Sequence, residues 1–246
     1  MLYEESADEL QKAIDSVLNT ICVSKLYLID NSPTNSIEKW LDKSDTLEYI
    51  HTNKNLGFGS GHNLVLDKIK KNSDYHLVLN PDASFDSKIL EELVQQLENN
   101  KELALVAPKV LFPNGEVQNS CRRYPKLSEM FFRRFPILRK TSKSIVNKGI
   151  YADVNLNEPF FSEYLTGCFH LYRTQDFIKI GGFDERYFLY MEDVDICKKI
   201  DQLGKKKMYY PKVHIEHVLK QRSAKDIKFF FRHTLSMIKY FMKWGF

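Results

Sequence analysis

Segments with helical spacing alternate with short apolar runs along most of this chain, and this alternation limits the possible folds more than any other feature. The predicted helices cover Asp8–Thr20, Ser60–Lys71, Ser87–Asn99 and Asp176–Ile180. The predicted strands are Lys25–Asp30, Leu47–His51, Tyr75–Leu79, Leu103–Ala107, Phe161–Tyr172 and Lys207–Tyr210. This order favours an α/β domain.

Capping and turn residues mark the ends of several of these elements. Ser87 is the expected N-cap of the helix that follows it, and Gly204 is the expected stop of a helix that begins at Glu192. The tripeptide Pro113-Asn114-Gly115 predicts a hairpin turn after the fourth strand.

Length and composition indicate one globular domain with a tail. With 246 residues, 43% of them hydrophobic, the chain can bury one substantial core. No run of about 18 apolar residues occurs, so no transmembrane helix is predicted, and no signal peptide is recognisable. The four cysteines lack C-x-x-C spacing, which argues against a zinc knuckle or a disulfide framework and favours a reducing cytoplasm.

An acid pair follows a glycine pair and an aromatic loop in the stretch GGFDERYFLYMEDVDICKK, residues 181–199. Gly181-Gly182 ends a short apolar helix, and Glu192-Asp193 begins the next one. The unpaired N–H groups and the positive dipole end of that helix favour an ionised carboxylate, so Asp193 is a candidate proton acceptor. The alternative is that these acids only start the helix.

Polar residues follow two predicted strands at their carboxyl ends, where open α/β sheets bind ligands. Asp30 ends the first strand, and Asn80-Pro81-Asp82 follows the third. Pro81 interrupts the ladder and directs Asp82 into the crevice. For Asp30 the alternative is an Asx turn, and for the tripeptide it is an ordinary turn.

Three glycines alternate in Gly57-Phe58-Gly59-Ser60-Gly61-His62-Asn63. The stretch is not a dinucleotide fingerprint, because His62 stands where G-x-G-x-x-G needs its last glycine. Alternating glycines allow the backbone to approach a flat or charged ligand closely, and the N-terminus of the following helix favours phosphate. A turn without a ligand is the alternative.

Basic and aromatic residues are concentrated in the loop region 122–150. From Arg122 to Lys148 there are nine basic residues and one acid, Glu129. This composition fits nucleic acid, an anionic membrane surface, a diphosphate acceptor, or a solvated loop without a ligand.

The tail from Lys225 onward predicts an amphipathic helix with apolar residues on one side and basic residues on or beside the other. The apolar residues are Ile227, Phe231, Leu235, Ile238 and Met242, and the basic ones are Lys228, Arg232, Lys239 and Lys243. One expectation is peripheral membrane contact through residues 225–246, with Trp244 and Phe246 as anchors. The other is packing against the domain.

Five blocks in order resemble the family 2 glycosyltransferases of the GT-A fold, and most nearly their rhamnosyltransferase-like branch. The blocks are LIDNSPT (28–34), NKNLGFGSGHN (53–63), LVLNPDA (77–83), TGCF...GGFDERYFLYMEDVDIC (166–197) and YYPKVHIEH (209–217). Their combination is specific, although each block alone is weak. The resemblance spans the chain up to about residue 223 and implies a single GT-A domain over residues 1–223, with a mostly parallel mixed central sheet flanked by helices. The basic amphipathic helix that the tail predicts follows over 224–246.

The resemblance also implies roles for individual residues. Asp193 would be the general base, with Gly167 and Glu192 on the acceptor side. Asp82 and His217 would hold Mn²⁺ or Mg²⁺, and Asn80 stands where the family's D-x-D motif has its first acid, so donor phosphates would complete the metal shell. The nucleotide-sugar-binding residues would be Asp30, Asn31, Gly57, Gly59, Asn63, Asn80 and Asp82.

The implied activity is transfer of a sugar, with inversion, from a nucleoside-diphosphate sugar to a hydroxyl of a saccharide or a lipid-linked glycan in cell-surface polysaccharide biosynthesis. The first donor expected is dTDP-L-rhamnose, followed by UDP-galactofuranose. The expected location is cytoplasmic, or peripheral on the inner face of the membrane, with no nucleic acid bound. The alternatives are a non-catalytic or nucleic-acid-binding α/β module that uses the basic loop and tail, and a nucleotidyltransferase.

The resemblance leaves one gap at the start of the chain. In the family a full apolar strand precedes the first helix, and here only Met1-Leu2-Tyr3 remains of it. A missing central strand leaves ladder groups of both neighbours unpaired, so apolar residues are predicted upstream of Met1.

Overall fold

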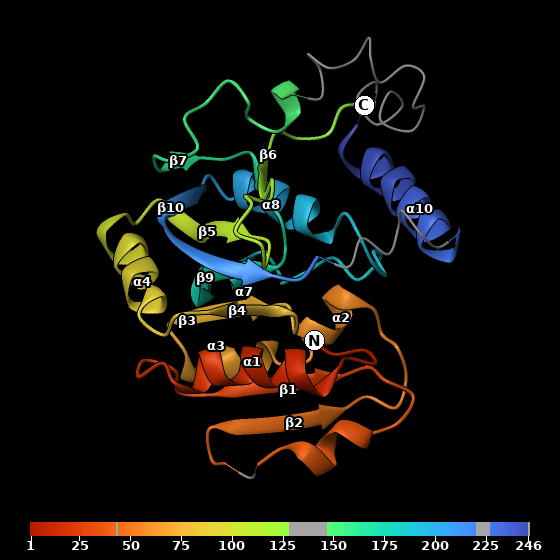
Figure 1. Cartoon of the computed structure of the whole chain (residues 1–246). Helices are drawn as coiled ribbons and strands as arrows, with labels where there is room; N and C mark the ends of the chain where they lie inside the picture. The colour runs from red at the N-terminus through yellow and green to blue at the C-terminus, as the bar shows by residue number, and fades with distance from the viewer. Residues whose placement is uncertain (43, 128–146, 220–226, 246) are drawn as a thin grey trace.

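A computed structural model describes residues 1–42, 44–127, 147–219 and 227–245, which form a mixed α/β domain (Figure 1). The helices are α1 (Ala7–Leu18), the 3₁₀ helix η1 (Ser36–Trp40), α2 (Phe58–Asn63), α3 (Leu66–Asn72), α4 (Ile89–Asn99), α7 (Thr174–Lys179), α8 (Glu192–Gln202) and α10 (Ile227–Trp244). The strands are β1 (Leu26–Asp30), β2 (Leu47–His51), β3 (Tyr75–Leu79), β4 (Ala83–Phe85), β5 (Leu103–Leu111), β6 (Cys121–Arg122), β7 (Phe160–Phe161), β8 (Tyr164–Leu165), β9 (Phe169–Arg173) and β10 (Lys206–His217). The expected α/β class is confirmed.

The central sheet has six strands in the order β3-β9-β5-β10-β4, and β7 pairs with β10. β10 runs parallel to β5, whereas the β3–β9, β5–β9, β4–β10 and β7–β10 pairs are antiparallel. β1 and β2 form a separate parallel pair. The expected mixed sheet is present with one correction: among the described strands antiparallel pairs outnumber parallel ones, because β9 runs antiparallel between β3 and β5.

The central strands are apolar because they are covered on both faces. Leu105 of β5 belongs to the hydrophobic core that contains Ile196 of α8, and its neighbour Val106 belongs to the core that contains Leu93 of α4. Successive residues of a strand point to opposite faces, so the run Leu103–Leu111 supplies both cores.

Two predicted elements are interrupted in the structure. The strand expected over Phe161–Tyr172 is three short strands, because β8 leaves the central sheet to pair with β6 and the chain turns at Gly167 before β9 begins. The helix expected over Ser60–Lys71 is divided into α2 and α3 at Leu64 and Val65.

The expected N-cap of α4 is also wrong. Lys88 occupies the cap position without a side-chain cap bond, and the carboxylate of Asp86 accepts the Lys88 N–H at 2.9 Å. The hairpin turn and the stop at Gly204 are confirmed: Phe112 N–H donates to the Glu116 carbonyl at 2.8 Å, and Gly204 has a φ of 72°.

β10 is longer than the sequence predicted, and its extra length matters for the site. The register against β5 shifts between Tyr210 and His214, around Pro211, which has no N–H for the ladder. Beyond that irregularity β10 continues to His217, where it pairs with β4.

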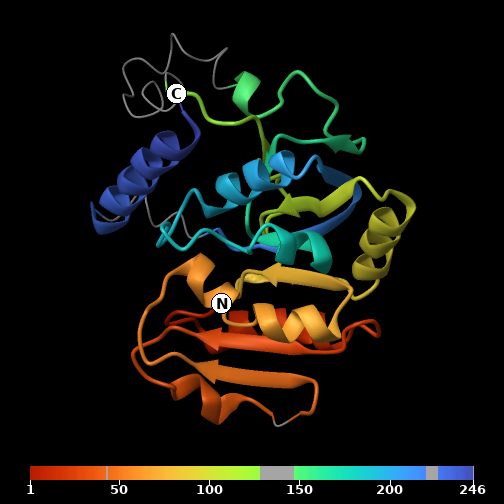
Figure 2. The same cartoon turned by 180° about the vertical axis from the view of Figure 1, so that it is seen from behind.

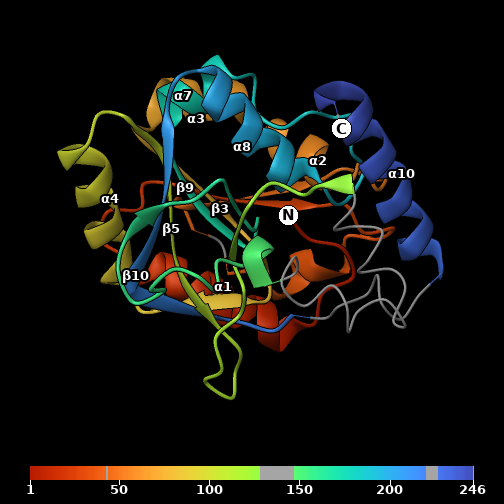
Figure 3. The same cartoon turned by 90° about the horizontal axis from the view of Figure 1, so that it is seen from above.

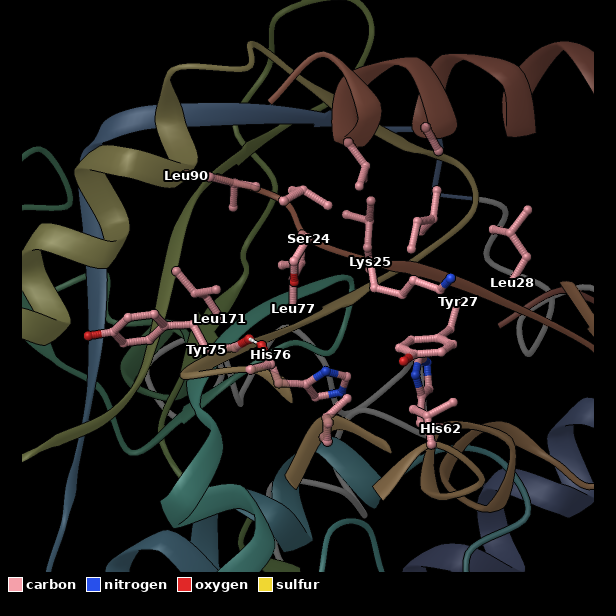
Figure 4. A pocket seen from close by; sticks show the side chains of 18 of the residues that line it. Ser24, Lys25, Tyr27, Leu28, His62, Tyr75, His76, Leu77, Leu90 and Leu171 are labelled. Carbon is pink, nitrogen blue, oxygen red and sulfur yellow. Dashed lines mark hydrogen bonds between the residues drawn. The ribbon is translucent and has the colours of Figure 1, made fainter. Parts of the chain in front are cut away.

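A cavity of about 540 Å³ lies between β1 and β3. α1 and α3 lie on opposite sides of this space (Figures 1 and 2), and side chains such as Tyr27 and Leu77 surround it (Figure 4). At one end, Leu2 pairs in parallel with β1: its N–H donates to Ile29 at 2.7 Å, and its carbonyl accepts the Asn31 N–H at 3.0 Å. Burial lowers the pKa of the Met1 amino group to about 6. Apolar residues upstream of Met1 therefore stay a prediction, with a space beside β1 for them to occupy.

α10 packs against the domain beside the loop 183–190 and the start of α8 (Figure 3). Ser236, Tyr240 and Phe241 are its buried residues. One of the two expectations for the tail, packing against the domain, is thus confirmed for one face of α10. None of the described helices is both long enough and apolar enough to cross a bilayer. Residues 128–146 of the basic loop region, residues 225–226 and Phe246 lie outside the described residues.

Candidate active site

The proposed metal ligands Asp82 and His217 lie together at one end of the central sheet. β10 and β4 are antiparallel with His217 opposite Ala83, and the Val218 N–H donates to the Asp82 carbonyl at 3.0 Å. This register brings His217 Nε2 to 3.3 Å from Asp82 Oδ1. The separation is slightly longer than an ordinary N–H···O hydrogen bond, so the two atoms face each other without a tight bond between them.

Gln118 fixes the orientation of the His217 ring, and the sequence analysis did not single it out. Its Oε1 lies 3.0 Å from His217 Nδ1, and its Nε2 donates to the His217 carbonyl at 2.6 Å. With Nδ1–H donating to Gln118, Nε2 carries the lone pair and points toward Asp82, while Asn80 Nδ2 lies 3.4 Å from the same nitrogen. A second residue that orients a histidine in this way is typical of metal sites.

The pair Asp82 and His217 fits part of a divalent metal shell. It offers one carboxylate and one imidazole, both acceptable to Mn²⁺. Among the described residues no group of three or more His, Cys, Asp or Glu could hold a metal ion. Asn80 supplies an amide where a second carboxylate would have completed the set, so oxygens from a bound ligand are needed.

Asp193 lies in the first turn of α8, against the turn that contains Gly167. The Gly167 N–H donates to Asp193 Oδ2 at 3.3 Å, and the Val194 N–H donates to Asp193 Oδ1 at 2.9 Å. A Cβ on Gly167 would lie 3.3 Å from the Asp193 Cβ. The absence of a side chain at position 167 therefore lets this carboxylate approach the backbone.

Burial raises the pKa of Asp193, and the hydrogen bonds from Val194 and Gly167 and the charge of Arg122 oppose the rise. Arg122 is thus a neighbour that the sequence analysis counted only as one of the loop cations. Burial, followed by the charge of Asp193, raises the pKa of Glu192 well above its usual range. The Glu192 Oε2 is buried and has no hydrogen-bond partner among the described residues.

The backbone just before Asp193 is held in an unusual conformation. Tyr190 and Met191 both have a φ of 69°, in the left-handed region that residues with side chains seldom occupy. Such conformations cost on the order of 1–3 kcal/mol each and occur where the surrounding structure requires them, often at functional sites.

The segment Thr166–Cys168 connects Asp193 with the Asp82 pair. The Asn80 N–H donates to the Cys168 carbonyl at 2.9 Å, one residue from the Gly167 N–H that binds Asp193. Burial raises the pKa of the Cys168 thiol to about 12, and the charges of both Asp82 and Asp193 act in the same direction. The Cys168 thiol is therefore within the electrostatic influence of both carboxylates.

Asp30 and Asn31 are fully buried, and their polar atoms are engaged within the protein. Asp30 Oδ1 accepts the Ser32 N–H at 2.9 Å, and Oδ2 accepts the Tyr49 hydroxyl at 2.6 Å. This is the Asx turn that the sequence left as the alternative. Asn31 Nδ2 donates to the Gly57 carbonyl at 3.0 Å. Contact of either side chain with a nucleotide stays a prediction and would require these bonds to be exchanged.

The glycine stretch packs on the loop 182–188 that precedes α8, a contact the sequence analysis missed. A Cβ on Gly57 would lie 2.3 Å from the Phe188 carbonyl oxygen, and one on Gly59 would lie 2.8 Å from the Phe183 Cβ. Asn63 accepts the Phe183 N–H at 3.0 Å and donates to the Phe183 carbonyl at 2.9 Å. The close backbone approach that the glycines permit is therefore made to protein, and α2 begins without a side-chain cap.

The large cavity between β1 and β3 is separate from the carboxylates. Asn80 and Pro81 line it, but Asp82, Asp193 and His217 do not. The candidate chemistry is thus at the ends of β4 and β10 and at the start of α8.

Comparison with known proteins supports a relationship over most of the chain. The family described as glycosyl transferase family 2 matches residues 1–181. The rhamnosyltransferase WbbL of Escherichia coli K12 is 27% identical over 202 residues, which cover 78% of this chain and 72% of the relative. An N-acetylglucosaminyl-diphospho-decaprenol L-rhamnosyltransferase of Mycobacterium tuberculosis is 23% identical over 228 residues, which cover 82% of this chain and 68% of the relative.

Solved structures with the same fold include GalNAc-T7 with UDP, GalNAc and Mn²⁺, at a TM-score of 0.66 and 16% identity over 89% of this chain and 42% of that one. The mannosyltransferase PcManGT from Pyrobaculum calidifontis, with GDP-Man and Mn²⁺, has a TM-score of 0.63 and 15% sequence identity. The match covers 98% of this chain and 61% of that one. This chain therefore spans less than two thirds of either solved protein. At these identities the likeness establishes the GT-A fold.

Proposed function

The chain belongs to glycosyl transferase family 2, and from this premise we propose that it is an inverting hexosyltransferase that moves a sugar from a nucleoside-diphosphate donor to an acceptor hydroxyl. The position of Asp193 is the observation on which the proposal depends. Its Oδ2 accepts the Gly167 N–H, and the carbonyl of the next residue, Cys168, accepts the N–H of Asn80, two residues before Asp82. The segment Gly167–Cys168 thus contacts both the proton acceptor and the turn that carries the donor-side carboxylate.

Asp193 acts as the general base in this proposal. It accepts the proton of the acceptor hydroxyl while that oxygen attacks the anomeric carbon from the face opposite the departing diphosphate. The pKa of the carboxyl is raised by burial, which strengthens it as a base, and the N–H groups of Gly167 and Val194 hold it in one orientation.

Asp82 and His217 would hold a divalent cation, Mn²⁺ or Mg²⁺, on the donor side. When bound, such an ion neutralises the charge that the leaving diphosphate gains. Gln118 keeps the Nε2 of His217 facing Asp82. The Asn80 amide lies 3.4 Å from the same nitrogen and would give up this contact when the Nε2 lone pair binds the ion. The presence of Mn²⁺ in two structures of this fold supports a cation in general terms.

The substrates follow from the relatives rather than from the site. Because two similar proteins are rhamnosyltransferases, dTDP-L-rhamnose is the first donor to test, with UDP-galactofuranose next. A polyprenyl-diphosphate-linked saccharide is the preferred acceptor, since one relative is named for a decaprenol-linked one. We place the enzyme in the cytoplasm at the inner membrane face, in polysaccharide assembly. The family match leaves the nucleic-acid-binding alternative without support.

A transfer assay with the full chain and Mn²⁺ tests the proposal. Release of the nucleoside diphosphate is measured for each donor, and donor binding is measured separately as a thermal shift. Asp193→Asn should abolish transfer and leave the shift intact, whereas Asp67→Asn, a change of an exposed acid on α3, should leave both unchanged. Loss of donor binding and transfer together in Asp193→Asn would show that Asp193 is structural.

A further inference from the structure

α10 has three distinct sides when its residues are placed at about 100° intervals around the helix axis. One side is buried on the domain through Ser236, Tyr240 and Phe241. A second side consists of apolar residues that fall within about 80° of each other. We name this second side the outer ridge: Ile227, Phe231, Leu235, Ile238 and Met242.

The outer ridge is exposed over the full length of the helix. Its five side chains are between 52 and 79% exposed, so packing on the domain does not account for their apolar character. An exposed apolar strip on a helix that is already docked is unusual for a monomeric soluble domain and indicates a surface that meets something apolar.

Cations border the outer ridge on one side. Lys228, Lys239 and Arg232 follow it within the next roughly 60° of the helix circumference. Lys239 donates to the Arg186 carbonyl at 2.6 Å, and Arg232 stacks on Phe188. Within the described part of the chain, neither cation forms a salt bridge with an acid. The sequence of α10 contains no Asp or Glu. The strip therefore offers an apolar surface with a positive margin.

The buried side fixes α10 to the helix that carries the base. Asp195, fully buried in α8, accepts hydrogen bonds at 2.7 Å from both Lys243 Nζ and Trp244 Nε1, and Lys243 also pairs with Asp184 at 2.7 Å. Asp195 is two residues from Asp193. α10 is thus bonded directly to the first turn of α8, beside which it lies (Figure 3).

We propose that the outer ridge of α10 docks on the surface of an anionic lipid bilayer, with the ridge in the acyl–headgroup boundary and Lys228, Arg232 and Lys239 at the headgroups. Apolar residues beside cations, with no acid in the helix, match a lipid surface better than a protein partner, whose interface would need its own complementary acids. This inference rests on the proposed function in one respect: docking would bring a lipid-linked acceptor in the bilayer to Asp193, the proposed base.

Vesicle co-sedimentation of the full chain tests the docking. Binding to phosphatidylcholine vesicles that contain phosphatidylglycerol should exceed binding to phosphatidylcholine alone and should weaken with salt. The triple variant Phe231→Ser, Leu235→Ser, Ile238→Ser should bind the anionic vesicles at least about tenfold more weakly, because three apolar side chains no longer enter the boundary. The matched control is Ile21→Ser, Trp40→Ser, which changes exposed apolar residues elsewhere and should bind as the unchanged chain does.

The outcomes separate docking from catalysis and from self-association. Asp193→Asn should bind vesicles normally while it fails in transfer, and the ridge variant should retain transfer to a water-soluble acceptor. Equal vesicle binding by the ridge variant and the unchanged chain would overturn the proposal. So would a change from dimer to monomer in the ridge variant, measured by sedimentation without lipid, since the ridge would then be an interface between two copies.

Discussion

The backbone nitrogen of Gly167 lies 3.3 Å from Oδ2 of Asp193, to which its N–H donates. A Cβ added at position 167 would lie only 3.3 Å from the Cβ of Asp193. Replacing Gly167 with alanine should therefore displace the carboxylate by a few tenths of an ångström and weaken its hydrogen bond. We expect kcat to fall by roughly ten- to a hundredfold, since small misplacements of a catalytic group are costly. The KM for donor should hardly change.

Steady-state kinetics with a thermal melt checks this prediction for Gly167→Ala. The melt should remain within a few degrees of the unchanged chain. An unaltered kcat would mean that the position of Asp193 does not depend on the space at Gly167.

Removing Gln118 should weaken metal binding without touching a proposed ligand. Gln118→Leu deprives His217 Nδ1 of its 3.0 Å partner, so the ring can rotate and its Nε2 no longer faces Asp82. Loss of such an orienting residue typically costs about 10- to 100-fold in metal affinity. Mn²⁺ titration followed by calorimetry in the presence of nucleoside diphosphate measures the change.

Gln202→Leu provides the matched control for Gln118, because Gln202 is exposed at the end of α8. Equal affinities in the two variants would argue against a cation at His217.

Activity should fall as pH is lowered through the pKa of Asp193, because the base must be ionised to accept a proton. Burial raises that pKa, and the Arg122 cation holds the rise back. Arg122→Gln removes the cation, so the pKa should rise further and the acidic limb of the kcat profile should move to higher pH. Profiles of both proteins across the acidic range provide the comparison, and a shift to lower pH would contradict the assignment.

Asp195→Ala should destabilise the protein strongly. The change leaves the Trp244 Nε1–H and the buried Tyr187 hydroxyl without their shared acceptor, while Lys243 keeps its pair with Asp184. The expected cost is about 3 kcal/mol in the free energy of unfolding. The control is Asp153→Ala, which breaks the exposed pair with Arg123 and should cost less than about 1 kcal/mol. Urea denaturation of the two variants tests the difference, and similar values would disprove a structural role for the buried acid.

A short apolar extension before Met1 should stabilise the chain. Leu2 already pairs with β1 at one end of the cavity, so about three further residues in the same register would run along Leu26–Leu28. An extension of alternating Val and Ile is expected to raise the thermal midpoint by several degrees, by burying apolar surface and pairing free strand edges. An extension of Ser and Asn of equal length is the control, and identical midpoints would count against the idea.

Local patterns in the sequence were sufficient for most elements but not for their ends. β2 and β3 match the predicted ranges, because each is a short run in which Leu, Ile, Val and Tyr predominate. The run from Phe161 to Tyr172 reads as one strand because each residue in it tolerates extended structure. Only pairing with β6 and β10 divides it, and those partners are distant in sequence.

The sequence by itself determined the family, the α/β class and the residue types of the candidate site, since these follow from short motifs and from periodicity. Tertiary structure decided how the residues are used. The alternating glycines accommodate Phe188 and Phe183, Asp30 is bonded to Ser32 and Tyr49, and Gln118, absent from every motif, orients His217. The physical reason is that a hydrogen bond or a close contact depends on distances between segments, and strand register and packing set those distances.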